Sequence, residues 1–214
     1  MSSTLSGSAR RVPQQERAAR RVDALLEAAG AAIAERGFEA VTMTEIAERA
    51  GASIGALYQY FPNKDALVFA LRTRYAGEME ARWTALSVAA EEWTVPELVD
   101  GLFDMMTSFM TTHPAYFPLL SVSLNFRRDA AARDRLRRSF AELFQRYQPA
   151  LSDDEAFRIA EVTLQVVKSM NPLYAVAKAK ERKRLLVEYR AVVASYLGAR
   201  LAPAFAAAEP AARR

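Results

Sequence analysis

The sequence predicts an all-α protein in which a small three-helix unit precedes a larger helical bundle. Apolar side chains recur every three or four residues through most of the chain, which is the spacing of an amphipathic helix. Three segments also follow the Ser/Thr-x-x-Glu pattern of a capping box, in which the two end residues hydrogen-bond each other's backbone at a helix start. These segments are Thr42-Met43-Thr44-Glu45, Thr94-Val95-Pro96-Glu97 and Ser152-Asp153-Asp154-Glu155.

Composition excludes several classes of protein. The 214 residues are 51% apolar and 25% charged, as in an ordinary globular chain. The absence of cysteine removes disulfides and thiolate sites and fits a reducing compartment. Residues 1–7 lack the features of an export signal, and no run of about eighteen apolar residues could span a membrane. We therefore expect a cytoplasmic protein with no membrane partner.

The N-terminal segment is basic. Residues 1–13 lack apolar periodicity, so we predict a flexible arm that ends near Pro13. Two interpretations of its charge are open: a solvated helix start, or contact with phosphates or the minor groove of DNA. The arginines of the arm and of the following helix are Arg10, Arg11, Arg17, Arg20 and Arg21.

Residues 14–36 are predicted to form the first helix, and two short helices follow it. The first short helix starts at the Thr42 cap and stops at Gly51, and the second starts at the Ser53 cap and stops at Pro62. Glycine suits the turn between them because it adopts backbone conformations that side chains resist. A longer helix packed across two short ones is the helix-turn-helix arrangement.

The second short helix is too short to be stable alone, so its neighbours must hold it. Leu57 and Phe61 lie four residues apart and can form its buried face. The side chains on the other faces need an explanation other than burial. They are Ile54, Gly55, Ala56, Tyr58, Gln59 and Tyr60.

Asn63 can cap a long helix that runs to about residue 88. At 1.5 Å per residue this helix would span roughly 35 Å, so we expect it to bridge the two halves of the chain. Its apolar stripe is Leu67, Leu71, Tyr75, Met79 and Trp83. The later helices are predicted at residues 95–112, 116–125, 129–147, 153–171 and 181–201, before a frayed tail at 202–214.

The segment from Thr42 to Leu67 resembles the DNA-binding signature of the TetR family of bacterial transcriptional regulators. The resemblance covers residues 14–70 in detail, while the rest agrees only in length and helical character. It implies a dimer with a helix-turn-helix DNA-binding domain at 14–62 and an effector-binding and dimerisation domain at 63–201. The matching residues are Ile46-Ala47, Ala50-Gly51, Ser53, Gly55, Leu57-Tyr58, Tyr60-Phe61 and Lys64-Asp65-Ala66-Leu67.

Physical chemistry gives roles to the residues of this signature. A two-turn helix fits the major groove, where Gln59 can pair with the edge of adenine. Ile54, Gly55 and Ala56 can only offer apolar contact to thymine methyls or a close backbone approach. Hydroxyl groups, an ammonium and the free amides of helix starts can bind phosphates. The candidate phosphate ligands are Thr42, Thr44, Ser53, Tyr58, Tyr60 and Lys64.

Some of these candidates also have a purely structural interpretation. Thr42 and Ser53 are fully explained as helix caps, and Tyr60 could simply pack on the long helix. Elsewhere, one histidine and no cysteine leave triads and most metal sites without members. His113 precedes a proline and is most easily a helix-end residue. We therefore expect no catalytic residues, no metal and no cofactor.

The second half is rich in large apolar side chains. Most must be core, and a minority could line a cavity. The TetR resemblance implies a small-molecule effector bound between these helices, which a hydrophobic or aromatic compound would suit. The candidate lining residues are Trp83, Phe103, Met106, Phe109, Met110, Tyr116, Phe117, Phe144, Met170 and Tyr174.

The same resemblance implies a homodimer through the last two helices, packed as a four-helix bundle. Residues 155–171 are apolar nearly all round, which fits this, although burial within one subunit would also explain it. The prediction is a dimeric repressor released from a palindromic operator by a small molecule. Its rivals are a constitutive DNA-binding dimer without an effector and, last, an all-helical enzyme.

Overall fold

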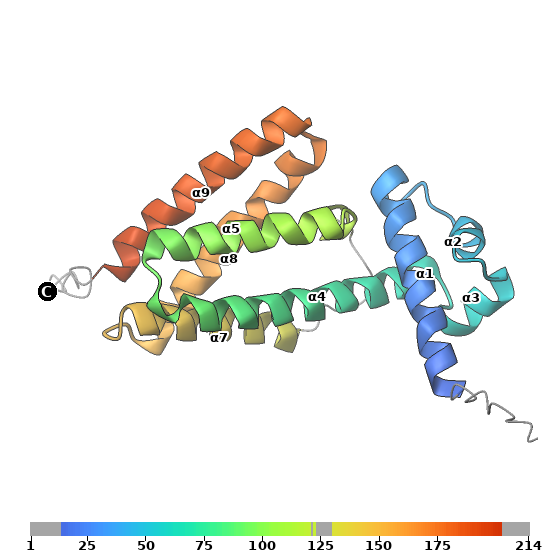
Figure 1. The fold of residues 1–214 in the computed structure, drawn as a ribbon, viewed down its shortest axis with the longest axis horizontal. Coiled ribbons are helices and arrows are strands. Elements are labelled where there is room, and N and C mark those ends of the chain that lie inside the picture. Colours follow the sequence, from blue (N-terminus) through green and yellow to red (C-terminus); the bar gives the residue numbers. More distant parts are fainter. Residues whose placement is uncertain (1–13, 121, 123–129, 203–214) are drawn as a thin grey trace, which may run out of the picture.

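The computed structural model describes residues 14–120, 122 and 130–202, and its regular elements in these ranges are all helices (Figure 1). The all-α prediction is confirmed. The predicted arm at 1–13 and the predicted tail beyond Ala202 lie outside the described residues. The elements are α1 (Gln14–Arg36), α2 (Met43–Arg49), α3 (Ile54–Tyr60), α4 (Lys64–Ala89), the 3₁₀ turn η1 (Ala90–Glu92), α5 (Val95–Thr112), α6 (Tyr116–Leu120), α7 (Ala130–Tyr147), α8 (Asp153–Val176) and α9 (Ala179–Leu201).

The two short helices begin at the predicted caps. The Thr42 hydroxyl accepts the Glu45 amide N–H at 3.2 Å, and the Ser53 hydroxyl accepts the Ala56 amide N–H at 3.2 Å. Gly51 has a φ of +62°, the left-handed conformation that the turn needs and that other residues resist. The predicted capping box at Thr42 is half wrong, because the Glu45 carboxylate pairs with arginines instead of completing it.

The three-helix unit has a core to which each of its helices contributes. α1 supplies Leu25 and Ile33, α2 supplies Ile46, and α3 supplies Leu57, all without exposed surface. Leu57 is the single buried side chain of the seven-residue α3. Because so short a helix is marginal in water, α3 depends on this contact for its stability.

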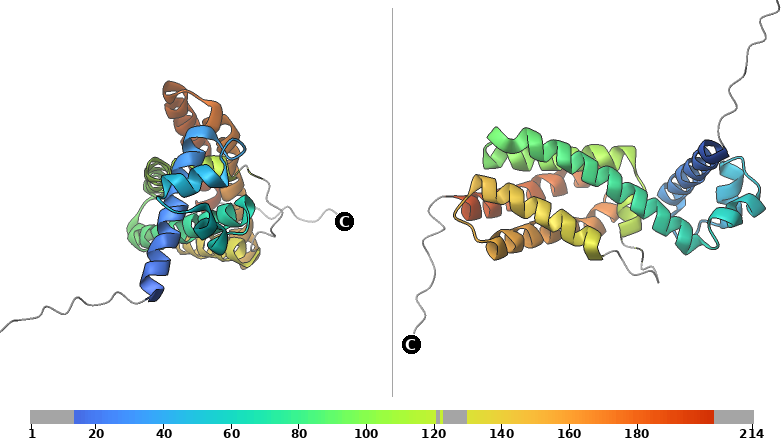
Figure 2. Two further views of the ribbon diagram at one scale, coloured as in Figure 1. Left: turned by 90° about the vertical axis from the view of Figure 1, so that its right-hand side faces the viewer. Right: turned by 90° about the horizontal axis from the view of Figure 1, so that it is seen from below.

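α4 belongs to both parts of the molecule. Its first turns place Leu67 and Leu71 in the core of the three-helix unit, and its later turns place Trp83 in the core of the bundle. Trp83 stacks on Phe140 of α7, with ring centroids 3.5 Å apart. Figure 2 shows the two parts at opposite ends of this helix. The bridging helix is therefore confirmed, and the change from one core to the other lies within α4.

The bundle is built from the second half of α4 with α5, α7, α8 and α9. α8 packs against both α7 and α9, and α5 packs against α9. α5 and α8 start at complete capping boxes, those of Thr94 and Ser152, as predicted. No helix in the described part of the chain is both long and apolar enough to cross a membrane.

The predicted end of α8 at Asn171 is wrong, because the helix continues through Pro172 to Val176. A proline inside a helix removes the one N–H that would bond to the carbonyl four residues earlier, here that of Lys168. The turn that follows is still held by packing, since Tyr174 meets Phe117 of α6 with ring centroids 5.5 Å apart. Of the helix predicted at 116–125, only the part to Leu120 lies in a described helix.

The short helix α6 joins the two cores. Its Leu119 is buried in the core of the three-helix unit, whereas its Phe117 is buried in that of the bundle. α6 contacts α1, α4 and α8. Beside it, the imidazole of His113 lies 4.7 Å from the Tyr75 ring, and its Nε2 lies 2.8 Å from Oε2 of Glu78. His113 therefore ends α5, as predicted, and also ties it to α4.

Candidate nucleic-acid interface

The outer face of α3 carries the residues predicted to read DNA. With Leu57 turned into the core, Tyr58 is 49% exposed and Ile54 is 39% exposed. Gly55 and Gln59 are exposed as well, whereas Ala56 and Tyr60 are half-buried. Tyr60 packs against the core of the three-helix unit. The face thus exposes the Tyr58 ring and the Gln59 amide to solvent, together with Ile54 and Gly55.

Polar side chains at the starts of α2 and α3 are also accessible to solvent. Thr42, Thr44 and Ser53 are all exposed. The hydroxyls of Thr42 and Ser53 cap their helices, and each can still donate its proton to an outside acceptor. The unpaired amides of a helix's first turn favour an anion, so both starts can face phosphates.

A cationic groove runs between α1, the turn after α2 and the end of α3. Its volume is about 580 Å³, and Arg17, Arg20 and Arg21 of α1 line it together with Gln59 and Tyr60 of α3. All three arginines are exposed. The structure thus brings the basic start of α1 beside the end of α3, which the sequence alone did not require. Arg10 and Arg11 lie outside the described residues.

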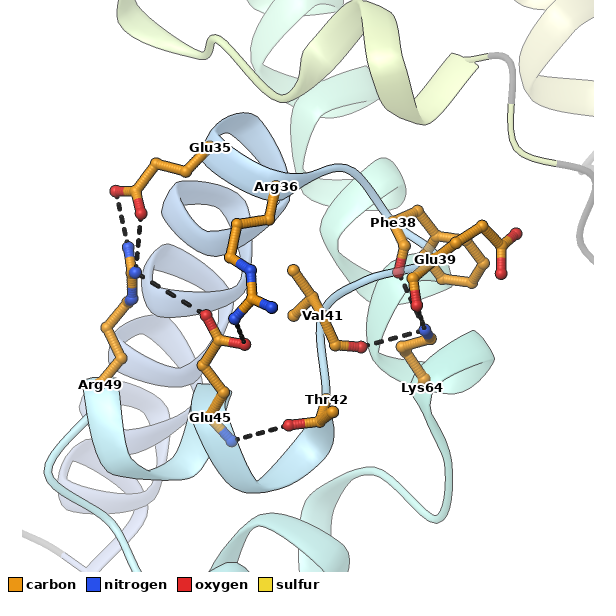
Figure 3. A network of polar contacts seen from close by, with 9 residues as sticks. All are labelled: Glu35, Arg36, Phe38, Glu39, Val41, Thr42, Glu45, Arg49 and Lys64. Carbon is orange, nitrogen blue, oxygen red and sulfur yellow. Dashed lines mark hydrogen bonds and ion pairs between the residues drawn. The ribbon is translucent and has the colours of Figure 1, made fainter.

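Ion pairs hold α1 and α2 together, and the sequence did not predict them (Figure 3). Arg49 donates two hydrogen bonds of 2.7 Å to the Glu35 carboxylate, and these bonds lower the pKa of Glu35. Arg36 donates to Glu45 at 2.8 Å. Each pair joins residues of different helices, so no spacing within one helix could reveal the pairing.

Lys64 occupies a different place from the other candidate phosphate ligands. It is half-buried, and its ammonium donates to the backbone carbonyls of Phe38, Glu39 and Val41 in the loop between α1 and α2 (Figure 3). The sequence carries no signal for this contact, because any residue type offers the same backbone carbonyl.

The ten candidate effector-lining residues lie in or against the two apolar cores. Eight of them are buried, and Tyr116 and Tyr174 are half-buried. Phe109 packs in the core of the three-helix unit, whereas Trp83, Phe103 and Phe144 pack in the bundle. A second hollow of about 280 Å³ lies between α6 and α8, and neither it nor the cationic groove is lined by any of the ten.

The surfaces of α8 and α9 expose large apolar side chains. Val176 is 85% exposed and Val187 is 65% exposed, and three others are exposed by two fifths or more. This exposure is unusual for a surface in water when several such residues share two adjacent helices. The three others are Val162, Leu173 and Val192.

Comparisons with known proteins agree with this architecture. The family model of bacterial regulatory proteins of the tetR family matches residues 25–71, and that of the tetracyclin repressor-like C-terminal domain matches residues 94–197. The HTH-type transcriptional repressor KstR of Rhodococcus jostii is 39% identical over 69 residues, which are 32% of this chain and 31% of that protein. The chain thus matches about a third of the length of these curated relatives.

Solved structures share the fold. A TetR-family transcriptional regulator from Streptomyces coelicolor gives a TM-score of 0.63 at 23% identity, covering 83% of this chain and 98% of that one. A TetR variant from Acinetobacter baumannii, solved in complex with minocycline, gives 0.58 at 15% identity, covering 88% and 96%. The expectation of a regulator rather than an enzyme is confirmed by the family models. This chain belongs to the TetR family of bacterial transcriptional regulators.

Proposed function

We propose that this protein is a dimeric repressor that binds a palindromic operator in the cytoplasm and leaves it when a small molecule binds the helical bundle. The observation that carries the proposal is the outward face of α3, where Tyr58 and Gln59 are exposed beside a cationic groove. Polar side chains next to clustered arginines are suited to a polyanion.

The contacts divide into phosphate binding and base reading. Thr44 and Tyr58 would donate hydroxyl protons to phosphates, as would the capping hydroxyls of Thr42 and Ser53. Gln59 would read the edge of adenine in the major groove. Ile54, Gly55 and Ala56 would press against thymine methyls or bring the backbone close to the bases, and Tyr60 would support the face from its half-buried position.

The arginine-lined groove extends this interface beyond α3. Arg17, Arg20 and Arg21 lie on α1 beside the end of the reading helix, so DNA held by α3 would pass next to them. Each phosphate contact by an arginine releases counterions and makes the affinity depend on salt. Because α3 offers few hydrogen bonds to bases, DNA shape and these charges would contribute much of the choice of site.

The dimer would form through α8 and α9. Their exposed valines and Leu173 would be covered by the same surface of a second copy, which a two-fold axis brings face to face. A two-fold dimer presents two α3 helices to one side of the duplex. The half-sites are then expected about one helical turn, roughly 34 Å, apart.

The effector response would run through α4 and α6. α4 takes part in both cores, and α6 touches α1, α4 and α8, so a shift of the bundle would move the three-helix units apart or together. A hundredfold loss of operator affinity needs only about 2.7 kcal/mol of differential binding. The TetR variant solved in complex with minocycline holds a small molecule, which supports a small-molecule effector here.

An effector of hydrophobic or aromatic character would have to separate side chains that are now packed, such as Phe103, Met106 and Phe144. The tight packing of these side chains favours the second candidate function, a constitutive DNA-binding dimer without an effector. The two functions differ in one measurement. An effector lowers operator affinity, whereas no compound does so for a constitutive binder.

Selection of bound sites from a random DNA pool tests the proposal. We expect enrichment of an inverted repeat, since the dimer is two-fold symmetric. Enrichment of a site without symmetry would contradict the dimer, and no enrichment at all would contradict sequence-specific binding. The same selected duplex then serves for a titration against aromatic compounds.

A further inference from the structure

We propose that Lys64 is a positioning residue, which fixes the loop between α1 and α2 relative to α4, and that it does not bind DNA phosphate. The inference rests on the proposed DNA binding, because it assigns a role within that interface. It also replaces the role that the sequence suggested for this side chain, which was a phosphate ligand.

The ammonium of Lys64 uses all its donors inside the protein. A protonated lysine has three N–H groups. Three carbonyl oxygens surround Nζ, those of Phe38 at 2.9 Å, Glu39 at 3.3 Å and Val41 at 3.0 Å. The ring of Phe38 lies beneath the charge, with its centroid 4.4 Å from Nζ. A phosphate could be reached only if these bonds were broken.

The loop needs such a donor because it lies between helices. Residues 38–41 belong to neither α1 nor α2, so no helical ladder satisfies their carbonyl groups. The loop leaves α1 at Gly37, whose φ of +79° reverses the chain, and leads directly to the Thr42 cap. Val41 is almost fully buried beside that cap. Holding these carbonyls therefore sets where α2 begins.

The position of Lys64 in its own helix points the same way. It is the first residue of α4, where the helix dipole presents its positive end and disfavours a cation. The three carbonyl groups point their negative oxygen atoms at the ammonium, and this attraction offsets the unfavourable effect of the helix dipole. Lys64 thereby ties the first turn of the bridging helix to the segment that starts α2, and α2 in turn packs against α3.

Two substitutions separate this role from phosphate binding. Lys64→Met keeps the length of the side chain and removes the ammonium. Lys64→Arg keeps the charge but replaces a compact group with three diverging donors by a planar fork. An arginine binds phosphate at least as well as a lysine, yet it cannot place single donors on three carbonyls that converge on one point. Lys180→Met, at an exposed position of α9, is the matched control.

The first measurement is amide hydrogen exchange of the free protein, with no DNA present. We expect faster exchange in residues 37–45 of both Lys64 variants and no change there in Lys180→Met. The second is operator affinity at several salt concentrations, well below the melting temperature, using a duplex that the wild-type protein selected from a random pool. We expect about a tenfold loss for both Lys64 variants, with the slope of log affinity against log salt unchanged.

The contrary outcomes are distinct. If Lys64→Arg binds like the wild type while Lys64→Met loses about 0.9 from the salt slope, Lys64 is a phosphate ligand and the proposal is wrong. Unchanged exchange in residues 37–45 of Lys64→Met would overturn it as well. If the wild-type protein selects no duplex, the proposed function fails, while the exchange measurement still decides whether Lys64 holds the loop.

Discussion

The three-helix unit and the bundle are stabilised by different means. In the three-helix unit, short helices are fixed by caps, by the ion pairs of Arg36 and Arg49, and by a small apolar core. In the bundle, long helices bury aromatic rings such as Trp83 and Phe144, and α8 and α9 still leave apolar surface exposed. The first part leaves polar and cationic side chains exposed on α1 and α3. The bundle has more large apolar side chains than its own core buries.

This difference indicates two kinds of partner. A polar and cationic surface on a fixed frame suits a rigid polyanion such as duplex DNA, because affinity depends on groups held in place. An exposed apolar surface suits a second protein surface. The free energy gained by burying it depends on the apolar area and not on the direction of individual contacts. The following experiments alter one part at a time, from the largest expected effect to the smallest.

The core contact of α3 should have the largest effect. Leu57→Ala leaves a cavity under the only buried side chain of this helix, and we expect a loss of about 3 kcal/mol in the stability of the three-helix unit. Amide hydrogen exchange of α1 to α3 measures it. Leu143→Ala, also fully buried but in α7, is the control and should lower protection in the bundle instead. If both variants lost the same protection from exchange throughout the chain, the two parts would unfold as one unit.

The apolar surface of the bundle comes next. In the double variant Val176→Glu/Val187→Glu, like charges would face each other across the proposed dimer contact, and operator affinity should fall on the order of a hundredfold as the second half-site is lost. Light scattering should then give a monomer. Val88→Glu, at an exposed position of α4, is the control and should leave the mass unchanged. A wild-type protein that is already monomeric at micromolar concentration would rule out this contact.

Two variants of the three-helix unit should distinguish the proposed base contacts from the proposed phosphate contacts. Gln59→Ala should cost about 1 to 3 kcal/mol on the preferred site and relax the choice at one base pair of each half-site, with the salt slope unchanged. Arg21→Gln should instead weaken binding to all sequences alike and reduce the slope by about 0.9. Mobility-shift titrations on the selected duplex and on a scrambled one measure both. The same response from the two variants would contradict the division of roles.

The capping boxes of the bundle should give the smallest effect, visible in acid. Hydrogen bonds from the hydroxyl and the backbone N–H of Ser152 hold the pKa of Glu155 below its ordinary value of 4.5. The carboxylate therefore stabilises the fold above pH 4.5, and this contribution disappears as pH falls through the lowered pKa. The melting temperature should drop less steeply over that range in Glu155→Gln. Parallel curves for the two proteins would mean that the box contributes nothing.

The sequence was most informative where a contact is local. The caps at Thr42, Ser53 and Asn63 and the turn at Gly51 join residues no more than three apart, so the order of residue types was enough to predict them. It failed at Pro172, where local propensity favoured a helix end but packing of the following turn carried α8 onward. Tertiary packing outweighs a single missing hydrogen bond.

The sequence alone determined the all-α class, the helix-turn-helix, the outward face of α3 and the bridging helix, because each follows from helical spacing and helix ends. Only the tertiary structure decided that the arginines of α1 line a groove beside α3, that α6 belongs to both cores, and that Lys64 lies on the loop carbonyls. These contacts join residues far apart in the chain, and the last is made to backbone atoms. Such contacts leave no pattern in the order of side chains, so they are apparent only in the folded structure.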